Sequence, residues 1–227
     1  MPQDKTIVKC MYCGGNIFVQ EAISKAGESN VANWLCLARE ALNASNYEEA
    51  FNYFTKMLEF DPQNSEAWFG KAQSAGWMST LTNFRVDEMI GGFKKVLECT
   101  PVDKKDELKK LVLLNIYELV FAYYKQSTEH FLKIKTSLLG SSIPSFEPRR
   151  EYAKRSIKII SAMELAHELL PERKEIIGTI IDFCSQIAED PNYFLLDQEV
   201  TILKAKKDFF VAKMNKCTDT SKNERMD

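Results

Sequence analysis

The stretch Asn33–Pro62, NWLCLAREALNASNYEEAFNYFTKMLEFDP, decides the fold of this chain. Apolar and small residues recur in it every three or four positions, which is the spacing of an amphipathic helix. The segment Asn43–Asn46 interrupts this pattern with residues that favour turns, and Asp61 and Pro62 end it. We therefore expect two antiparallel helices, at about 31–44 and about 47–60, joined by a tight turn.

The same pattern returns one period later. Trp34 and Trp68 lie 34 positions apart, and each is followed by the same small residues, Ala38 and Ala41 in the first copy and Ala72 and Ala75 in the second. The first copy ends with Phe54 and Pro62, and the second ends with Phe93 and Pro101. The two prolines are 39 positions apart, so we expect a longer loop, through Ser79–Phe84, between helices at about 64–77 and about 86–98.

These residues follow the W-x2-L-G-x2-Y…A-x3-F…P pattern of the tetratricopeptide repeat, whose period is about 34 residues. Asn33–Pro62 closely resembles one such repeat, and Ser65–Pro101 resembles a looser copy with Lys71 in place of the family's Leu. Alanines replace the family's Gly and Tyr in both copies. The resemblance implies an all-α fold, an α-α superhelix of stacked antiparallel helix hairpins with a concave face.

Helical periodicity continues beyond Pro101, although the repeat pattern fades. We expect a long helix over about 103–139, with Leu111, Leu114, Ile116, Leu119, Val120 and Tyr123 on a broad apolar face, and helices at about 148–170, 172–189 and 193–215. This gives eight helices in four hairpins. The predicted divisions are two repeats over 31–101, degenerate helical repeats packed on them over 102–216, and a flexible tail over 217–227.

Residues 1–30 form a separate predicted segment. Thr6–Lys9 and Asn16–Val19 are short β-prone runs on either side of Cys10-Met11-Tyr12-Cys13-Gly14-Gly15. We expect a short N-terminal β-hairpin, which we call the knuckle. It resembles half of a zinc ribbon, because two residues between Cys10 and Cys13 let both thiolates bind one ion and the glycines permit a tight turn.

A structural zinc usually has four ligands, and the sequence offers no second CxxC pair. Three alternatives stay open: two chains share one zinc through Cys10 and Cys13, distant ligands complete the site, or the knuckle holds no metal. A redox dithiol is disfavoured, because such pairs normally open a helix within an α/β fold. Cys36, Cys99 and Cys184 lie in apolar surroundings and are interpreted as small core residues.

The family resemblance places ligand contacts on one face of the first helix of each hairpin. In this chain the matching residues are Leu35, Arg39, Leu42 and Asn43, and one period later Phe69, Gln73, Gly76 and Trp77. They lack the Lys and Asn pattern with which one sub-class binds a C-terminal carboxylate, so we expect an apolar or mixed groove for a protein or peptide. An alternative interpretation is that later helices cover Leu35, Phe69 and Trp77. Trp34, Leu37, Ala38, Ala41, Ala50 and Phe54 are interpreted as packing residues.

The composition argues against a nucleic-acid-binding protein and against a membrane-spanning one. A net charge of −2 and a pI near 5.9 give no general attraction to nucleic acid, and no apolar run is long enough for a membrane span. The chain opens without a signal segment, and its few cysteines are typical of a reducing compartment, so we expect a cytoplasmic protein. Neither His130 nor His167 belongs to a catalytic motif.

The main hypothesis is therefore a noncatalytic scaffold that binds a protein or peptide on its concave face. Two other hypotheses stay open: a homodimer linked by zinc at Cys10 and Cys13, with the helices structural, and an enzyme whose site lies in the degenerate C-terminal helices.

Overall fold

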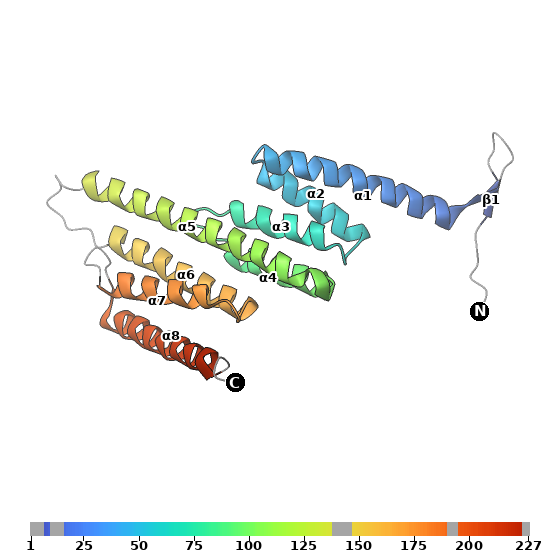
Figure 1. The fold of residues 1–227 in the computed structure, drawn as a ribbon. Coiled ribbons are helices and arrows are strands. Elements are labelled where there is room, and N and C mark those ends of the chain that lie inside the picture. Colours follow the sequence, from blue (N-terminus) through green and yellow to red (C-terminus); the bar gives the residue numbers. More distant parts are fainter. Residues whose placement is uncertain (1–6, 10–15, 138–146, 190–194, 224–227) are drawn as a thin grey trace.

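The computed structural model describes residues 7–9, 16–137, 147–189 and 195–223, with side chains over 30–135, 147–189 and 195–215. The described residues form an all-α fold, as predicted (Figure 1). Its α-helices are α1 (Val19–Asn43), α2 (Tyr47–Phe60), α3 (Ser65–Trp77), α4 (Val86–Cys99), α5 (Lys105–Ser137), α6 (Glu147–Leu169), α7 (Lys174–Glu189) and α8 (Asp197–Asn223), and a 3-10 turn, η1 (Val102–Lys104), precedes α5.

Two three-residue strands precede α1. β1 (Ile7–Lys9) and β2 (Asn16–Phe18) pair antiparallel, with Val8 opposite Ile17. The residues between the strands, including Cys10 and Cys13, lie outside the described residues, so the structure does not test their predicted role as zinc ligands.

Local signals in the sequence set the boundaries of α2 and α3. The side chain of Asn46 accepts a hydrogen bond from the backbone N–H of Glu49, and that of Asn64 accepts one from Ala67 at 2.9 Å. Both asparagines therefore cap a helix, because they satisfy a backbone N–H that has no partner within the helix. Ser45 adopts a left-handed conformation (φ 58°) in the tight turn before Asn46.

Two helices are longer than predicted. α1 begins at Val19 rather than near residue 31, because residues 20–26 include the strong helix formers Glu21, Ala22 and Lys25. α8 continues to Asn223 instead of ending near residue 215, so the predicted flexible tail from Cys217 is largely helical. No Gly or Pro interrupts the sequence of α8, and polar composition alone does not end a helix.

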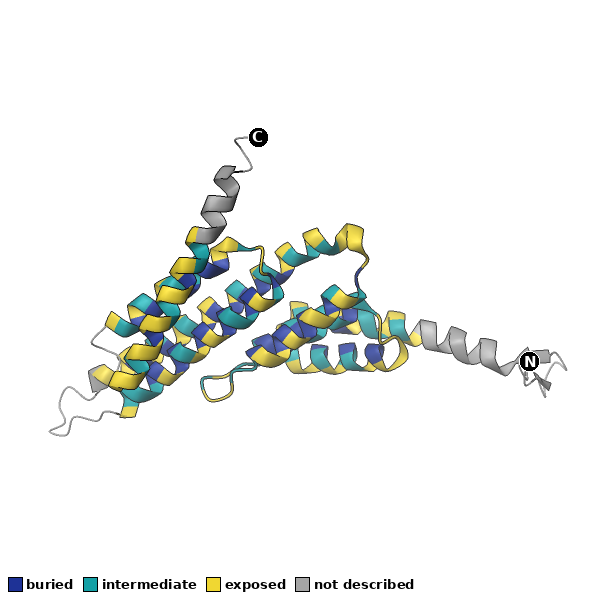
Figure 2. Ribbon diagram, turned by 90° about the horizontal axis from the view of Figure 1, so that it is seen from below, coloured by how far each residue is buried: buried dark blue, intermediate teal, exposed yellow. Residues whose placement is uncertain are grey.

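Neighbouring helices pack in sequence order, with one change in the middle of the chain. α1 packs on α2, α2 on α3 and α3 on α4, whereas α4 contacts both α5 and α6. α6 then packs on α7 and α7 on α8 (Figure 1). Buried and exposed residues alternate along the helices (Figure 2), and the buried apolar ones form a smaller cluster within α1–α3 and a larger one that extends from α3 to α8.

Most of the predicted packing residues are buried. Ala38, Ala41, Ala50 and Phe54 are all in the smaller cluster, which confirms their predicted role. Trp34 is only half-buried and Leu37 is 41% exposed, so the prediction for Leu37 was wrong. No described helix hairpin precedes α1, so Leu37 has no neighbouring hairpin to cover it.

The three cysteines that were predicted to be core residues differ in their burial. Cys184 is fully buried in α7, whereas Cys99 is half-buried and Cys36 is exposed on α1. The prediction of a core position was therefore correct for Cys184 and wrong for Cys36. Residues within one helical turn face both the core and the solvent. Apolar neighbours in the sequence therefore do not show that a residue lies on the buried side.

Within the described ranges, no helix combines the length and the apolar content needed to cross a membrane.

Candidate binding surface

Polar side chains connect the first helices of successive hairpins. Arg39 of α1 forms an ion pair with Glu66 of α3. Gln73 of α3 donates a hydrogen bond of 2.8 Å from Nε2 to Oδ1 of Asn115 in α5. These contacts place the predicted residues Arg39 and Gln73 on a surface shared by the odd-numbered helices α1, α3 and α5.

The same relationship continues from α5 to α7. The hydroxyl oxygens of Tyr117 and Thr179 lie 3.2 Å apart, and Gln186 Nε2 donates a 2.6 Å hydrogen bond to the hydroxyl of Tyr124. Burial raises the pKa of Tyr117, so its hydroxyl stays protonated at neutral pH. Four neighbouring odd-numbered helices are thus joined by side-chain hydrogen bonds or ion pairs.

One face of α3 holds the second half of the predicted site. Glu66, Phe69, Gln73 and Trp77 are three or four positions apart, so they share this face. The ring centroid of Phe69 lies 5.3 Å from that of Phe93, and it is half-buried against the larger core cluster. Trp77 is also half-buried, and it stacks on Tyr47 of α2 at 5.9 Å with an interplanar angle of 18°.

The predicted residues of α1 have different surroundings. Arg39 and Asn43 are exposed, whereas Leu35 and Leu42 pack partly buried against the smaller core cluster. Leu35 and Leu42 therefore contribute to the fold as well as to the surface. Gly76 is buried, and a Cβ there would lie 2.6 Å from Met89 Sδ and 3.0 Å from Leu119 Cδ2.

Sequence reasoning missed a row of exposed apolar residues on α5. Leu111, Leu114 and Phe121 are 45%, 53% and 48% exposed, whereas Ile116, like Leu119, Val120 and Tyr123, is buried. Leu111 and Leu114 were predicted on the same apolar face as Ile116, and this prediction was wrong. Positions 111, 114 and 121 fall on a different side of the helix from positions 116, 120 and 123, but apolar residues occupy both sides, so the sequence pattern gave no signal for which side is buried.

Aromatic contacts hold Phe121 in place. Its ring centroid lies 5.8 Å from Tyr117 on the same helix and 5.9 Å from Phe183 of α7, and Phe183 in turn contacts Tyr124 at 5.2 Å. We define the odd-helix surface as a set of exposed and half-buried residues on α1, α3 and α5: Arg39, Phe69, Gln73, Trp77, Leu111, Leu114 and Phe121.

A pocket of about 410 Å³ adjoins this surface at Trp77. Its other lining residues include Leu119, Tyr123 and Gln126 of α5. The hydroxyl of Tyr123 donates a hydrogen bond of 3.3 Å to the carbonyl oxygen of Leu81, and burial raises its pKa. The pocket therefore combines apolar walls with polar and charged side chains, among them Lys125, Gln126 and Glu129, a lining that suits one side chain of a bound peptide.

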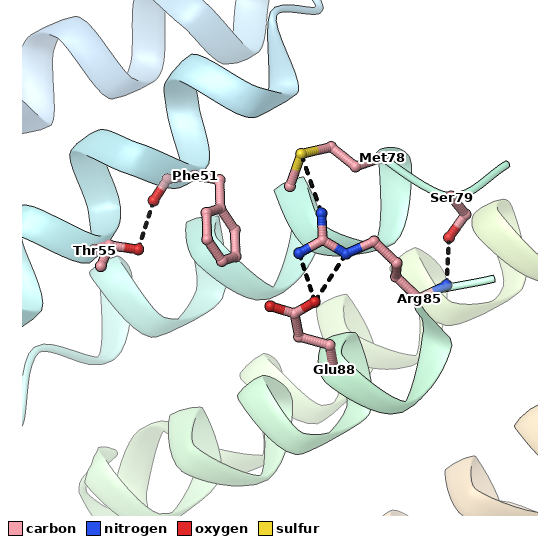
Figure 3. Close-up of polar contacts among 6 residues, drawn as sticks. All are labelled: Phe51, Thr55, Met78, Ser79, Arg85 and Glu88. Atoms are coloured by element: carbon pink, nitrogen blue, oxygen red, sulfur yellow. Dashed lines mark hydrogen bonds and ion pairs between the residues drawn. The ribbon is translucent and has the colours of Figure 1, made fainter. Parts of the chain in front are cut away.

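The predicted longer loop between α3 and α4 is fixed by Arg85 (Figure 3). The Arg85 backbone N–H donates to Ser79 Oγ at 3.0 Å, and its guanidinium binds Glu88 and contacts Met78 Sδ. The guanidinium also lies 5.3 Å from the ring centroid of Phe51.

Lys71 of α3 contacts the same ring. Its Nζ lies 5.0 Å from the ring centroid of Phe51 and 5.6 Å from that of Trp68. A cation over an aromatic face is attracted by the ring quadrupole. Lys71 therefore joins α3 to α2 through Phe51.

The described side chains offer no group of three or more His, Cys, Asp or Glu residues positioned to hold a metal ion. His130 is exposed on α5. His167 is buried in α6, and neither of its ring nitrogens has a hydrogen-bond partner.

No protein-family model matches the chain, and a search of curated proteins finds no significant match.

Proposed function

We propose that the chain is a noncatalytic scaffold of tetratricopeptide-like hairpins that binds a protein segment on its odd-helix surface. The observation that carries the proposal is the row of Leu111, Leu114 and Phe121, three large apolar side chains about half exposed on one helix. Apolar side chains gathered on a folded surface mark interaction sites more often than isolated ones do.

The fixed positions and the composition of the surface side chains support a protein or peptide ligand. The hydrogen bond from Gln73 to Asn115 and the contacts of Phe121 with Phe183 keep these side chains in fixed positions, so a ligand has less side-chain entropy to remove. Arg39 and Glu66 add a polar edge to the apolar centre. An apolar centre with a polar rim is the usual composition of a protein interface.

The resemblance to a tetratricopeptide repeat explains why the proposed scaffold consists of stacked hairpins. A single helix hairpin cannot bury its apolar faces, so stacked hairpins share one core and leave the first helices free to contact a ligand. The side-chain bonds from α1 to α3, α3 to α5 and α5 to α7 are consistent with such stacking.

The test compares three full-length proteins in quantitative affinity capture from the source cells. Leu114→Glu combined with Phe121→Glu introduces two charges on the odd-helix surface, whereas Val102→Glu changes an apolar residue that is 84% exposed on η1. We expect at least one partner to be retained by the wild type and by Val102→Glu and to be lost by the double variant. Equal capture by all three proteins would contradict the proposed surface, provided that their thermal unfolding is the same.

A further inference from the structure

The last described helix carries an apolar stripe that no described element covers. Ile202, Ala205, Phe209 and Ala212 are spaced by three, four and three positions, so they share one side of α8, and all are exposed. Ile202 is 48% and Phe209 61% exposed. A different side of α8, with Leu203 and Phe210, is buried against the rest of the fold. α8 therefore has two apolar sides, which is expected of a helix with neighbours on both.

The stripe forms one wall of a groove of about 660 Å³ between α6 and α8. The opposite wall is Glu164, His167 and Glu168 of α6, and Lys206, Phe210 and Lys213 of α8 also line the groove. Lys206 is paired with Glu164 across the groove at 2.5 Å.

His167 points independently to a ligand in this groove. It is only 4% exposed, and both ring nitrogens lack a hydrogen-bond partner. A buried polar group without a partner is unfavourable, so native proteins usually supply one. The ring centroid of His167 lies 5.9 Å from that of Phe210, and this ring contact is no substitute for a hydrogen bond.

We infer that the groove and stripe bind a second copy of this chain, with two α8 helices packed antiparallel. Reversing the stripe about its midpoint places Ile202 opposite Ala212 of the second copy and Ala205 opposite Phe209 of the second copy. Each large side chain then meets a small one, as close packing of two helices requires. A two-fold dimer needs such a self-complementary surface.

The charges beside the stripe fit the same arrangement. Lys204 and Asp208 are exposed on one flank of the stripe, one turn apart. The reversal brings Lys204 within two positions of Asp208 of the second copy, so two reciprocal ion pairs form about the two-fold axis. The helix of the second copy also covers the groove and brings its polar groups toward His167. This dimer uses the opposite end of the chain from Cys10 and Cys13, and it does not depend on the proposed function.

The test is sedimentation equilibrium of the full chain in the presence of a metal chelator, which removes any contribution from zinc. We expect a concentration-dependent dimer for the wild type and for Leu132→Glu, a matched control because Leu132 is 48% exposed on α5. Phe209→Glu should be monomeric, with the same melting temperature as the wild type when both are measured at a concentration where the wild type has dissociated. A wild-type protein that stays monomeric would overturn the inference, as would a Phe209→Glu variant that dimerises normally.

A size exchange tests the antiparallel pairing itself. Ala205→Phe places two phenylalanines opposite each other, and Phe209→Ala leaves two alanines opposite each other, so each single variant should dimerise at least about 10-fold more weakly. Combining them restores one large and one small residue at each contact, and the double variant should dimerise as tightly as the wild type. No recovery in the double variant would rule out this pairing.

Discussion

The ring of Phe54 in α2 lies directly against the backbone of Gly70 in α3. A Cβ added to Gly70 would be 2.1 Å from Cζ of Phe54, closer than non-bonded carbon atoms approach. Phe54 is 1% exposed, so its ring has no open space into which to move. The approach of the second hairpin to the first therefore depends on a position without a side chain.

Gly70→Ala should destabilise the fold by about 1–3 kcal/mol, because the added methyl group overpacks a filled core. Gly91→Ala in α4 is the matched control, since a Cβ there would meet nothing within 4 Å. The control should raise stability by up to about 1 kcal/mol, because alanine favours a helix more than glycine does. Urea unfolding measures both changes, and a shift in the same direction for the two variants would contradict the packing of Phe54 on Gly70.

The two polar contacts of the odd-helix surface should differ in strength. Gln73→Ala removes the hydrogen bond to Asn115, which is 8% exposed and would lose the donor to its Oδ1, so we expect a loss of about 1–2 kcal/mol. Arg39→Ala removes an ion pair whose side chains are 61% and 50% exposed, and it should cost less than about 1 kcal/mol. Unfolding curves for the two variants check the order, and a larger loss for Arg39→Ala would be inconsistent with it.

The boundaries of α2, α3 and α4 could be predicted because local residues determine them. Asn46 and Asn64 cap helices through their own side chains, and Pro62 ends α2 regardless of what packs around it. The side of α5 that faces solvent could not be predicted in this way. Leu111, Leu114 and Ile116 are all suitable for a core, and only the positions of α3, α4, α6 and α7 decide which of them is buried.

The candidate site also combines features that the sequence could predict with features that it could not. The repeat period aligned Arg39 with Gln73, and both lie at contacts between odd-numbered helices. The pairing of Gln73 with Asn115 depends on α5, which lies beyond the recognisable repeats, so no period in the sequence pointed to it. The lack of a hydrogen-bond partner for the imidazole of His167 could not be predicted either, because it depends on which elements surround α6 in the folded protein.

Cysteine labelling distinguishes a buried thiol from an exposed one. Burial raises the pKa of the Cys184 thiol to about 11, so little reactive thiolate is present at neutral pH. Cys36 is exposed and should react with iodoacetamide at least about 100-fold faster than Cys184 in the folded protein. Mass spectrometry of the labelled peptides measures both rates. In urea the two cysteines should react alike, and rapid labelling of Cys184 without unfolding would contradict its position in the core.

The zinc hypothesis makes a separate prediction for the N-terminal segment. If two chains share one ion through Cys10 and Cys13, protein purified with zinc should contain about half a zinc per chain, because four thiolates complete a structural site. Cys10→Ser combined with Cys13→Ser should lose the metal, whereas Cys36→Ser should keep it. Elemental analysis of the three proteins decides the matter. One zinc per chain would indicate further ligands from the same chain, and metal-free wild-type protein would exclude the site.

His167 should make the stability of the fold depend on pH. Burial, together with the positive charge of Lys213, lowers the pKa of its imidazole below the ordinary value of about 6.5. Between these two pKa values the unfolded chain binds more protons at this residue than the folded chain does. Stability from this residue is therefore complete above the ordinary pKa and falls as the pH decreases through it.

His167→Leu removes this titration and both unpartnered nitrogens while keeping an apolar side chain of similar size. The variant should be at least as stable as the parent at about pH 7.5, and it should lose less stability than the parent on going to about pH 5.5. His130→Gln changes the other, exposed histidine of the chain and is the matched control. Urea unfolding of all proteins at a concentration too low for dimer formation keeps self-association out of the comparison. An identical pH slope for His167→Leu and its parent would mean that the folded protein does not hold this imidazole in its neutral form.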